Sequence, residues 1–286
     1  MNIIKKMIII YDAPGQTCNR LWSYVFSIAR CIAEHRKLVI LFHDESIEDF
    51  PSFLHCPYIY FPLWHKWLFE HCNGWKYYKG LTWRIKFDYN ERWGKLCDFF
   101  GFTNGWKTRF ESCYVKQALP ELQKIFRPKD EIMQKAQAMV DSLRESSDLV
   151  VGVHIRRGDY SSWHDGRFYF ELETYHQFML RIQQIYKDKK VSFFICSNED
   201  FSLDVFKQCD CQRFGKEPSG AILDLYTLSL CDQLIGPIST YSRWASFIGE
   251  KPLCFIDSKS QIITAESFSK IVDFFHFENG NEIYDW

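Results

Sequence analysis

The stretch LVVGVHIRRGDY, residues 149–160, decides the fold. Its first seven residues are apolar except for His154, which is the pattern of a β-strand buried on both faces of a sheet. Two arginines, a glycine that permits a tight turn and an aspartate follow directly. In open α/β sheets ligands bind outside the carboxyl ends of the strands, and the forked guanidinium group matches phosphate oxygens in pairs. We therefore predict an anion-binding loop at Arg156 and Arg157. The pattern leaves open that these arginines pair instead with local acids such as Asp159.

Strands and helices alternate on both sides of this stretch. Downstream of it, helices are expected at residues 172–186, 201–208, 221–230 and 241–248, and strands at residues 191–196, 233–235 and 252–256. Near the amino terminus, the apolar runs 7–11 and 38–42 flank a segment, 19–35, whose apolar residues recur at helical spacing. Strands that alternate with helices of this length form a parallel, doubly wound sheet. The sequence therefore predicts an α/β protein with two such halves, residues 1–146 and 147–286.

The later part of the first half has a different character, that of an aromatic-rich insert. Residues 50–114 are dense in Trp, Phe, Tyr and His without a regular period, so mixed short helices and loops are expected there. An amphipathic helix broken at Pro128 is expected over residues 120–144. Aromatic residues make up 18% of the chain and suit stacking on sugar rings, although packing explains them equally well. The tryptophans that would stack on an acceptor sugar are Trp64, Trp67, Trp75 and Trp83.

Composition narrows the class of protein and its compartment. The net charge of −1 excludes a global field that would recruit nucleic acid or an anionic membrane. The eleven cysteines are odd in number and contain no CxxC pair, which argues against a disulfide framework or a zinc site and favours a reducing, cytoplasmic location. The apolar run at residues 7–11 is too short for a membrane span, so at most a peripheral membrane association is expected.

Three further segments combine polar residues with the ends of expected strands or helices. Asp224 lies near the start of a helix, where it either caps the helix or accepts hydrogen bonds from a guanine edge or a ribose. Ser239, Thr240 and Tyr241 lie between a strand and a helix, where hydroxyl and N–H groups either cap the helix or bind an anion. Residues 197–200, Ser-Asn-Glu-Asp, follow another strand and are expected to cap a helix rather than to bind a metal.

The first strand-to-helix turn holds Gly15, Asn19 and Arg20. Dinucleotide binding would require GxGxxG at this turn, and the sequence lacks that pattern as well as the P-loop. Asp12 and His43 lie near the carboxyl ends of the two expected strands of this half and are weak candidates for a general base.

These segments resemble the α1,2-, α1,6- and O-fucosyltransferase superfamily, and most closely the bacterial α1,2-fucosyltransferases of glycosyltransferase family 11. The matching residues occur in the family's order: Asn19-Arg20-Leu21, His154-x-Arg156-Arg157-Gly158-Asp159-Tyr160, Ser197-Asn198-Glu199-Asp200, Ile222-Leu223-Asp224, Ser239-Thr240-Tyr241-Ser242 and Trp244. The chain departs from the family's pattern at three positions: Cys18 stands for a glycine, Ile238 for an asparagine and Arg243 for a tryptophan. The last two lie in the loop expected on the phosphate side.

The resemblance implies a GT-B fold, in which two Rossmann-like halves face a cleft. It further implies inverting transfer of fucose from GDP-fucose to a galactoside hydroxyl in α1,2 linkage, without a metal or another cofactor. The amino-terminal half would be the acceptor side, and the carboxyl-terminal half would bind the donor, so the partners are a nucleotide sugar and a glycan. Three alternatives remain open: a transferase that uses another nucleotide sugar, a metal-dependent GT-A transferase, and a carbohydrate- or nucleotide-binding protein without catalysis.

The resemblance also implies roles for the basic loop. Arg156 would clamp the β-phosphate and stabilise the charge that develops on it, while Arg157 would brace the loop on the donor side. No general base stands out, and Asp159, as the nearest carboxylate in the sequence, is the candidate.

Two residues would recognise the nucleoside of the donor: His154 would contact it, and Asp224 would read the guanine. The other implied residues are Ser239, Thr240 and Tyr241 at the phosphates, and Gly15, Asn19 and Arg20 near the sugar and the acceptor.

Overall fold

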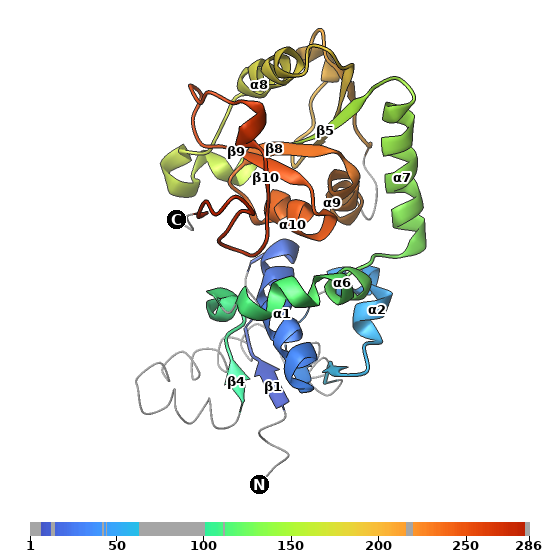
Figure 1. Cartoon of the computed structure of the whole chain (residues 1–286), viewed down its shortest axis with the longest axis vertical. Coiled ribbons are helices and arrows are strands. Elements are labelled where there is room, and N and C mark those ends of the chain that lie inside the picture. The colour runs from blue at the N-terminus through green and yellow to red at the C-terminus, as the bar shows by residue number, and fades with distance from the viewer. Residues whose placement is uncertain are drawn as a thin grey trace. The chain divides into compact units, whose positions relative to one another are not determined.

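The structure of the chain is a computed structural model that describes residues 7–12, 15–41, 43, 45–62, 101–110, 112–215 and 220–283. The chain divides into two compact units, Met1–Pro128 and Lys129–Trp286 (Figure 1). Each unit has a β-sheet of its own. The four tryptophans expected to stack on an acceptor, Trp64, Trp67, Trp75 and Trp83, lie outside the described residues.

The amino-terminal unit is built on a four-stranded parallel sheet in the order β3-β2-β1-β4. Its elements are β1 (Met7–Ile10), α1 (Thr17–Glu34), β2 (Lys37–Ile40), α2 (Pro51–Leu54), β3 (Ile59–Tyr60), β4 (Phe102–Thr103) and α6 (Val115–Ile125), with 3₁₀ turns at Glu45–Asp49, Lys107–Phe110 and Ser112–Tyr114. The predicted strand–helix–strand start is confirmed, and the apolar face of α1, with Leu21, Val25 and Ile28, is buried. Short helices and loops are present where residues 50–114 are described, but two short strands that were not predicted, β3 and β4, also lie there.

The carboxyl-terminal unit is built on a six-stranded sheet in the order β10-β9-β8-β5-β6-β7. Its strands are β5 (Leu149–Ile155), β6 (Val191–Ser197), β7 (Asp210–Gln212), β8 (Gln233–Pro237), β9 (Pro252–Ile256) and β10 (Ser269–Lys270). All neighbouring strands are parallel except β10, which runs antiparallel to β9. The prediction of a mostly parallel, doubly wound sheet is confirmed for this unit.

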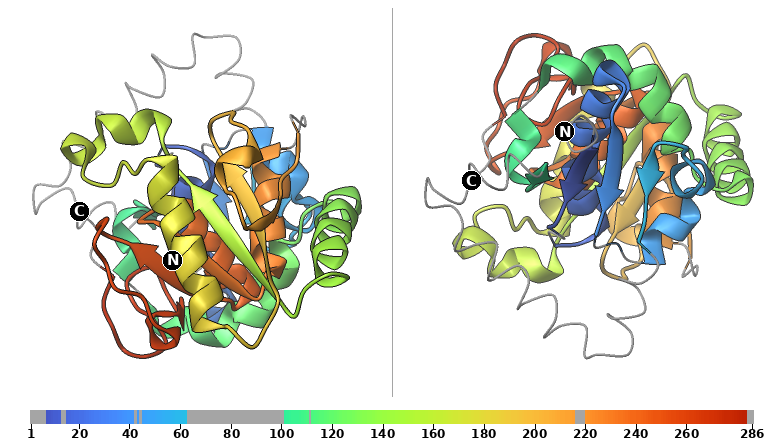
Figure 2. Two further views of the ribbon diagram at one scale, coloured as in Figure 1. Left: turned by 90° about the horizontal axis from the view of Figure 1, so that it is seen from above. Right: turned by 90° about the horizontal axis from the view of Figure 1, so that it is seen from below.

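Helices cover both faces of this sheet. On one face, alternate residues of β5, Val151, Val153 and Ile155, pack in one buried cluster with residues of α8 (Leu172–Ile185), the yellow helix that lies over the sheet in the left view of Figure 2. On the other face lie α7 (Asp130–Arg144), α9 (Gly220–Leu230) and α10 (Thr240–Gly249). All seven residues of β5 are buried, because both faces of this central strand are covered.

The two units divide at Pro128, whereas the sequence places the division near residue 146. The helix expected over residues 120–144 is broken as predicted, into α6 and α7. The second of these helices packs its buried residues, among them Ile132, Ala136 and Val140, in the carboxyl-terminal unit beside α9. The break at the proline, rather than the polar cluster after α7, therefore marks the boundary.

The helix expected over residues 201–208 is wrong. The chain forms only a 3₁₀ turn, Leu203–Val205, and then enters β7, a three-residue edge strand that the sequence did not reveal. A strand of three residues is too short to show a period of two, whereas the apolar residues before it mimic one turn of a helix.

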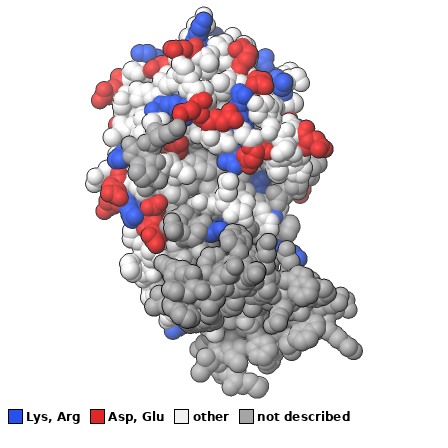
Figure 3. All heavy atoms as spheres, turned by 180° about the vertical axis from the view of Figure 1, so that it is seen from behind, with Lys and Arg blue, Asp and Glu red and all other residues white. Residues whose placement is uncertain are grey.

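Charged side chains of both signs are interspersed over the carboxyl-terminal unit on the face shown in Figure 3. On this face no large field of one sign gathers, in keeping with the net charge of −1. Among the described residues, no helix has the length and hydropathy that crossing a membrane requires.

Candidate active site

The order of the strands marks one edge of the carboxyl-terminal sheet as the place for a ligand. β5 pairs with β6 on one side and with β8 on the other. The chain runs from β5 through α8 to β6, and it returns to the other side of β5 only later, through α9 to β8. Such a reversal is a topological switch point, and ligands bind in the crevice outside the carboxyl ends of the strands there.

His154 lies at this switch point, one residue before the end of β5. Its buried ring packs on the ring of Tyr241 from α10, with 4.9 Å between the centroids. Burial, and then the positive charge of Arg156, lowers the pKa of the imidazole to about 3, so the ring is neutral at physiological pH. Its Nδ1 atom is buried and has no hydrogen-bond partner among the described residues. A buried polar atom of this kind suits a ligand, because leaving it unpaired costs about 1–3 kcal/mol.

Gly236 on β8 makes room for His154. A Cβ atom at this position would lie 2.7 Å from the backbone oxygen of His154 and 3.0 Å from its Cβ atom. We expect Gly236→Ala to lower the free energy of unfolding by about 1–3 kcal/mol, because the neighbouring backbone must move. Chemical denaturation measures this, with Gly215→Ala as the control, since nothing lies within 4 Å of a Cβ atom there. Equal stability of the two variants would contradict the close fit.

Arg156 and Asp159 form a two-point ion pair at the end of β5. The arginine Nε atom lies 2.9 Å from one carboxylate oxygen, and Nη2 donates a hydrogen bond of 2.9 Å to the other. The arginine side chain is 18% exposed and the aspartate side chain 56% exposed. Of these two contacts only that of Nη2 has the geometry of a hydrogen bond, and the carboxylate lies where a phosphate would meet the same guanidinium group. The sequence left open that the arginines pair with local acids, and the structure shows this pairing between Arg156 and the exposed Asp159.

Arg157 faces protein groups instead. Its Nε atom lies 3.1 Å from a carboxylate oxygen of Glu199, and Nη1 lies 3.1 Å from one of Glu171. Its Nη2 atom donates a hydrogen bond of 2.5 Å to the hydroxyl of Tyr169. These contacts fit the bracing role for Arg157 better than direct contact with a donor.

Residues 197–200 hold the basic loop and cap no helix, so the capping expectation is wrong. The side-chain oxygen of Asn198 accepts a hydrogen bond from the N–H of Arg157, and Glu199 accepts one from the N–H of Gly158. The nearby 3₁₀ turn is capped instead by Ser202. Within the described parts of the chain, no group of three or more His, Cys, Asp or Glu residues is placed to hold a metal ion.

Asp224 projects from the first turns of α9 into a partly buried position. Burial raises the pKa of its carboxyl group to about 7, against the opposing effect of the positive charge of Arg213. Burial, and to a smaller extent the charge of Asp224, also raises the pKa of the Cys196 thiol near the end of β6. No described residue donates a hydrogen bond to the Asp224 carboxylate. A ligand with N–H donors would therefore stabilise its charged form.

The loop from β8 to α10 supplies hydroxyl groups at the same edge. Ser239 caps α10, since its Oγ atom accepts a hydrogen bond of 3.2 Å from the N–H of Tyr241. The Tyr160 hydroxyl donates to the carbonyl of Ile238, and the Tyr241 hydroxyl donates to the carbonyl of Ala221. Capping is thus observed, and the Ser239 hydroxyl also lies in hydrogen-bond contact with Tyr160.

A model of the family described as glycosyl transferase family 11 matches residues 66–268, which is more than half of the chain. The chain belongs to glycosyltransferase family 11. The matched residues contain the basic loop, Asp224 and the loop from β8 to α10. A direct comparison with the sequences of curated proteins gives no match.

Solved structures of fucosyltransferases share the fold of this family 11 chain. A substituted form of Arabidopsis thaliana FUT1 in complex with GDP is 13% identical, with 98% of this chain and 77% of that chain covered and a TM-score of 0.60. POFUT1 in complex with GDP is 12% identical, with 88% of this chain and 98% of that chain covered and a TM-score of 0.54. Fucosyltransferase NodZ from Bradyrhizobium is 15% identical, with 90% of this chain and 97% of that chain covered and a TM-score of 0.50. The chain therefore has the GT-B type of fold, with two Rossmann-like units.

Arg243, where the family favours tryptophan, does not line the predicted phosphate loop. Its buried side chain points toward the carboxyl-terminal segment, where Nη1 donates a hydrogen bond of 2.8 Å to the carbonyl of Phe274. The guanidinium group also lies 4.1 Å from the centroid of the Phe274 ring. This departure from the family pattern therefore anchors the last segment of the chain.

The predicted site residues of the amino-terminal unit lie at the turn before α1 and in the first turn of that helix. Gly15 has a φ of +46°, and a Cβ atom there would collide with the side chain of Asn19, so these two residues form one compact turn. Arg20 is half-buried in the first turns of α1. Asp12 is buried and accepts hydrogen bonds of 2.7 and 3.0 Å from the N–H groups of Gly105 and Trp106. These bonds give Asp12 a structural role.

Sequence reasoning missed Glu171, Tyr169 and Arg213, all of which contact the basic loop or its supports. Arg213 donates hydrogen bonds to the carbonyl groups of Phe201 and Glu199. None of these residues lies in a recognisable motif, and their spacing in the sequence does not show that Tyr169 and Glu171 turn back toward Arg157.

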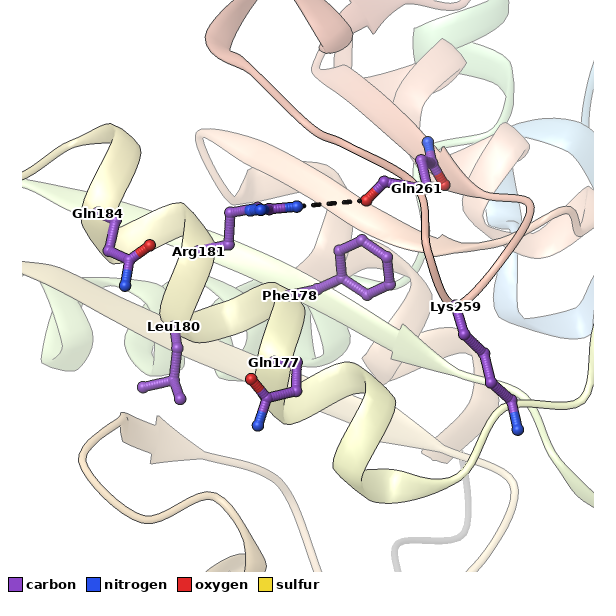
Figure 4. Close-up of a pocket in the computed structure, with 7 residues that line it drawn as sticks. All are labelled: Gln177, Phe178, Leu180, Arg181, Gln184, Lys259 and Gln261. Atoms are coloured by element: carbon purple, nitrogen blue, oxygen red, sulfur yellow. Dashed lines mark hydrogen bonds between the residues drawn. The ribbon is translucent and has the colours of Figure 1, made fainter.

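A polar groove lies on α8, on the opposite face of the sheet from His154. Its lining residues, shown in Figure 4, are Gln177, Phe178, Leu180, Arg181, Gln184, Lys259 and Gln261. Arg181 donates a hydrogen bond of 3.4 Å to the carbonyl of Gln261 across it. The groove contains none of the predicted site residues.

Proposed function

We propose that the chain is an inverting glycosyltransferase that transfers fucose from GDP-fucose to a galactoside hydroxyl, in α1,2 linkage. The observation that carries the proposal is the arrangement at the switch point: Arg156 with its forked donors beside the neutral imidazole of His154, whose Nδ1 atom has no hydrogen-bond partner among the described residues. Membership of family 11 supports it. So do structures of the same fold described as FUT1 and POFUT1 in complex with GDP and as NodZ soaked with GDP-fucose.

In this proposal the carboxyl-terminal half binds the donor. Arg156 exchanges the Asp159 carboxylate for the β-phosphate, His154 contacts the nucleoside, and Asp224 accepts hydrogen bonds from the guanine. Ser239, Thr240 and Tyr241 line the phosphates. The amino-terminal half is the acceptor side, with Gly15, Asn19 and Arg20 near the sugar and the acceptor.

The reaction is a single displacement. The acceptor oxygen bonds to the anomeric carbon while the bond from that carbon to the β-phosphate oxygen breaks, and the bonding electrons leave with GDP. The hydroxyl proton passes to a base or to solvent. Negative charge grows on the β-phosphate in the transition state, and a preorganised guanidinium group there stabilises it without reorganisation.

The ion pair supports a role for Asp159 in holding the guanidinium group of Arg156 until the β-phosphate displaces it, rather than the role of general base. Asp159→Asn is then expected to lower kcat about fivefold or less, because so exposed an ion pair contributes about 1 kcal/mol at most. The pH–rate profile should keep its acidic limb. If Asp159 is the base, the variant should instead lose that limb and fall by about 10²–10⁴-fold.

We further propose that the reaction needs no metal and takes place in the cytoplasm. Arg156 supplies the positive charge that a metal ion would otherwise supply at the leaving group. All nine cysteines among the described residues are free thiols, which fits a reducing compartment.

The proposal is tested by incubating the purified protein with GDP-fucose and a panel of galactosides, with and without EDTA. We expect fucose on the galactose 2-hydroxyl, identified by NMR, at the same rate in both conditions. GDP-mannose and UDP-galactose serve as competing donors. Turnover with a UDP-sugar alone, loss of activity in EDTA, or tight GDP binding without turnover would each overturn it in favour of one of the alternatives.

A further inference from the structure

The backbone of the basic loop is held from the neighbouring strand. Ile155 at the end of β5 is paired in register with Ser197 at the end of β6, so the two following loops leave the sheet side by side. The Glu199 carboxylate accepts a hydrogen bond of 2.9 Å from the N–H of Gly158 through one oxygen. Its other oxygen lies 3.1 Å from Nε of Arg157. One carboxylate thus fixes both the main chain and a side chain of the loop.

The fit between the two loops is close. The side-chain oxygen of Asn198 accepts a hydrogen bond of 3.0 Å from the N–H of Arg157. Gly158 has a φ of +35°, and a Cβ atom there would lie 2.7 Å from the side-chain nitrogen of Asn198. A residue other than glycine would therefore push the loops apart and would also strain the backbone.

Glu199 is itself held in place. Its N–H donates a hydrogen bond of 3.1 Å to the Ser197 hydroxyl, and its carbonyl accepts one of 3.2 Å from Arg213. Its carboxylate therefore projects from a fixed main chain.

The two adjacent arginines differ in the acids that they meet. Arg157 lies between the carboxylates of Glu199 and Glu171 and bonds to the Tyr169 hydroxyl, so its charge is compensated within the protein. Arg156 pairs with Asp159, which is more than half exposed and can swing away into solvent. Glu171 is as exposed as Asp159, so the two arginines differ in the number of their partners: a ligand has to displace one acid from Arg156, but two acids and a hydroxyl group from Arg157.

We propose that Glu199 is a positioning residue for the donor site: by binding Arg157 and the N–H of Gly158, it directs Arg156 alone toward the β-phosphate. This inference rests on the proposed function, because it takes a nucleoside diphosphate as the ligand of Arg156. A positioning residue acts through another residue, so its loss should matter only while Arg156 and the β-phosphate are both present.

The test measures GDP and GMP affinities by calorimetry for the wild type, Glu199→Gln, Arg156→Ala and the double variant. Glutamine keeps an acceptor for the Gly158 N–H but removes the charge that holds Arg157. We expect Glu199→Gln to weaken GDP binding about tenfold, within the range of coupling between neighbouring residues, and to leave GMP binding unchanged. In the Arg156→Ala background the same substitution should change GDP affinity less than twofold.

Thermal unfolding of each variant separates positioning from misfolding, and Glu199→Asp provides a variant that keeps the charge if glutamine is not tolerated. Glu173→Gln on α8, an exposed site, is the matched control and should change neither affinity. Equal losses of GDP and GMP affinity, additive effects in the double variant, or unchanged GDP affinity in Glu199→Gln would overturn the inference alone. A wild-type protein that binds no GDP would overturn the proposed function and this inference with it.

Discussion

Arg156→Ala is expected to lower kcat by about 10²–10³-fold while the protein stays folded. The substitution removes the guanidinium group that, in the proposed reaction, meets the charge growing on the β-phosphate. Loss of one preorganised donor at such a position costs about 2.7–4 kcal/mol in the barrier. Steady-state kinetics with GDP-fucose and a galactoside measure the effect. Arg156→Lys should recover only part of the rate, since an ammonium group cannot bind two phosphate oxygens in a forked geometry.

Arg181→Ala is the control for this prediction. It removes an arginine from α8 on the opposite face of the sheet, where one long hydrogen bond to the Gln261 carbonyl is recorded. Its kcat should equal that of the wild type. If Arg156→Ala keeps its fold and most of its activity, the assignment of the leaving-group role to Arg156 is wrong.

Asp224→Asn is expected to weaken GDP binding by about 10–100-fold at pH 8. The reason is that hydrogen bonds from the guanine edge to a carboxylate contribute about 1.5–3 kcal/mol, and an amide offers one oxygen and two competing N–H groups. Asp224→Asn should also reduce the preference of the protein for GDP over IDP, because IDP lacks the 2-amino donor of guanine. Calorimetric titration with both nucleotides measures the change. Asp188→Asn at an exposed turn should leave both affinities unaltered.

The raised pKa of Asp224 gives this prediction a pH signature. The group contributes stability that is present below its ordinary pKa of 3.8 and is lost as the pH rises toward about 7, where the folded protein ionises it. Guanine donors favour the charged form, so GDP affinity should be highest above pH 7 and fall below it, with proton release on binding. Asp224→Asn should abolish this pH dependence between pH 5 and 8. A pH dependence that persists in the variant would assign it to another group.

The central strand and its loop could be predicted because their signals are local. Seven consecutive residues of β5 that are buried on both faces read as an apolar run, and Arg156 follows within two residues of His154. The alternation of strands and helices around them needs no long-range information. The switch point then follows from the order of the strands, which the sequence alone does not give.

The residues that hold the basic loop in place could not be predicted, because they reach it through contacts between segments that are distant in the sequence. Glu171 and Glu199 reach Arg157 from positions 14 and 42 residues later in the chain. Burial of the Asp224 carboxyl group depends on how α9 packs on the sheet, and the direction of Arg243 depends on the path of the last segment. At residues 201–208, where a helix was expected, the chain forms only the 3₁₀ turn Leu203–Val205 before it reaches the edge strand β7, which pairs with β6.

The most direct test of the central claim is thermal unfolding of the wild type with GDP, GDP-fucose, UDP-glucose and UDP-galactose, each with and without EDTA. A ligand at about one hundred times its Kd adds about 2.7 kcal/mol to the free energy of unfolding, which raises Tm by several degrees. The account predicts stabilisation by GDP and GDP-fucose, equal in both conditions, and none by the UDP-sugars. Stabilisation by UDP-sugars alone, or a response to GDP that disappears with EDTA, would contradict it.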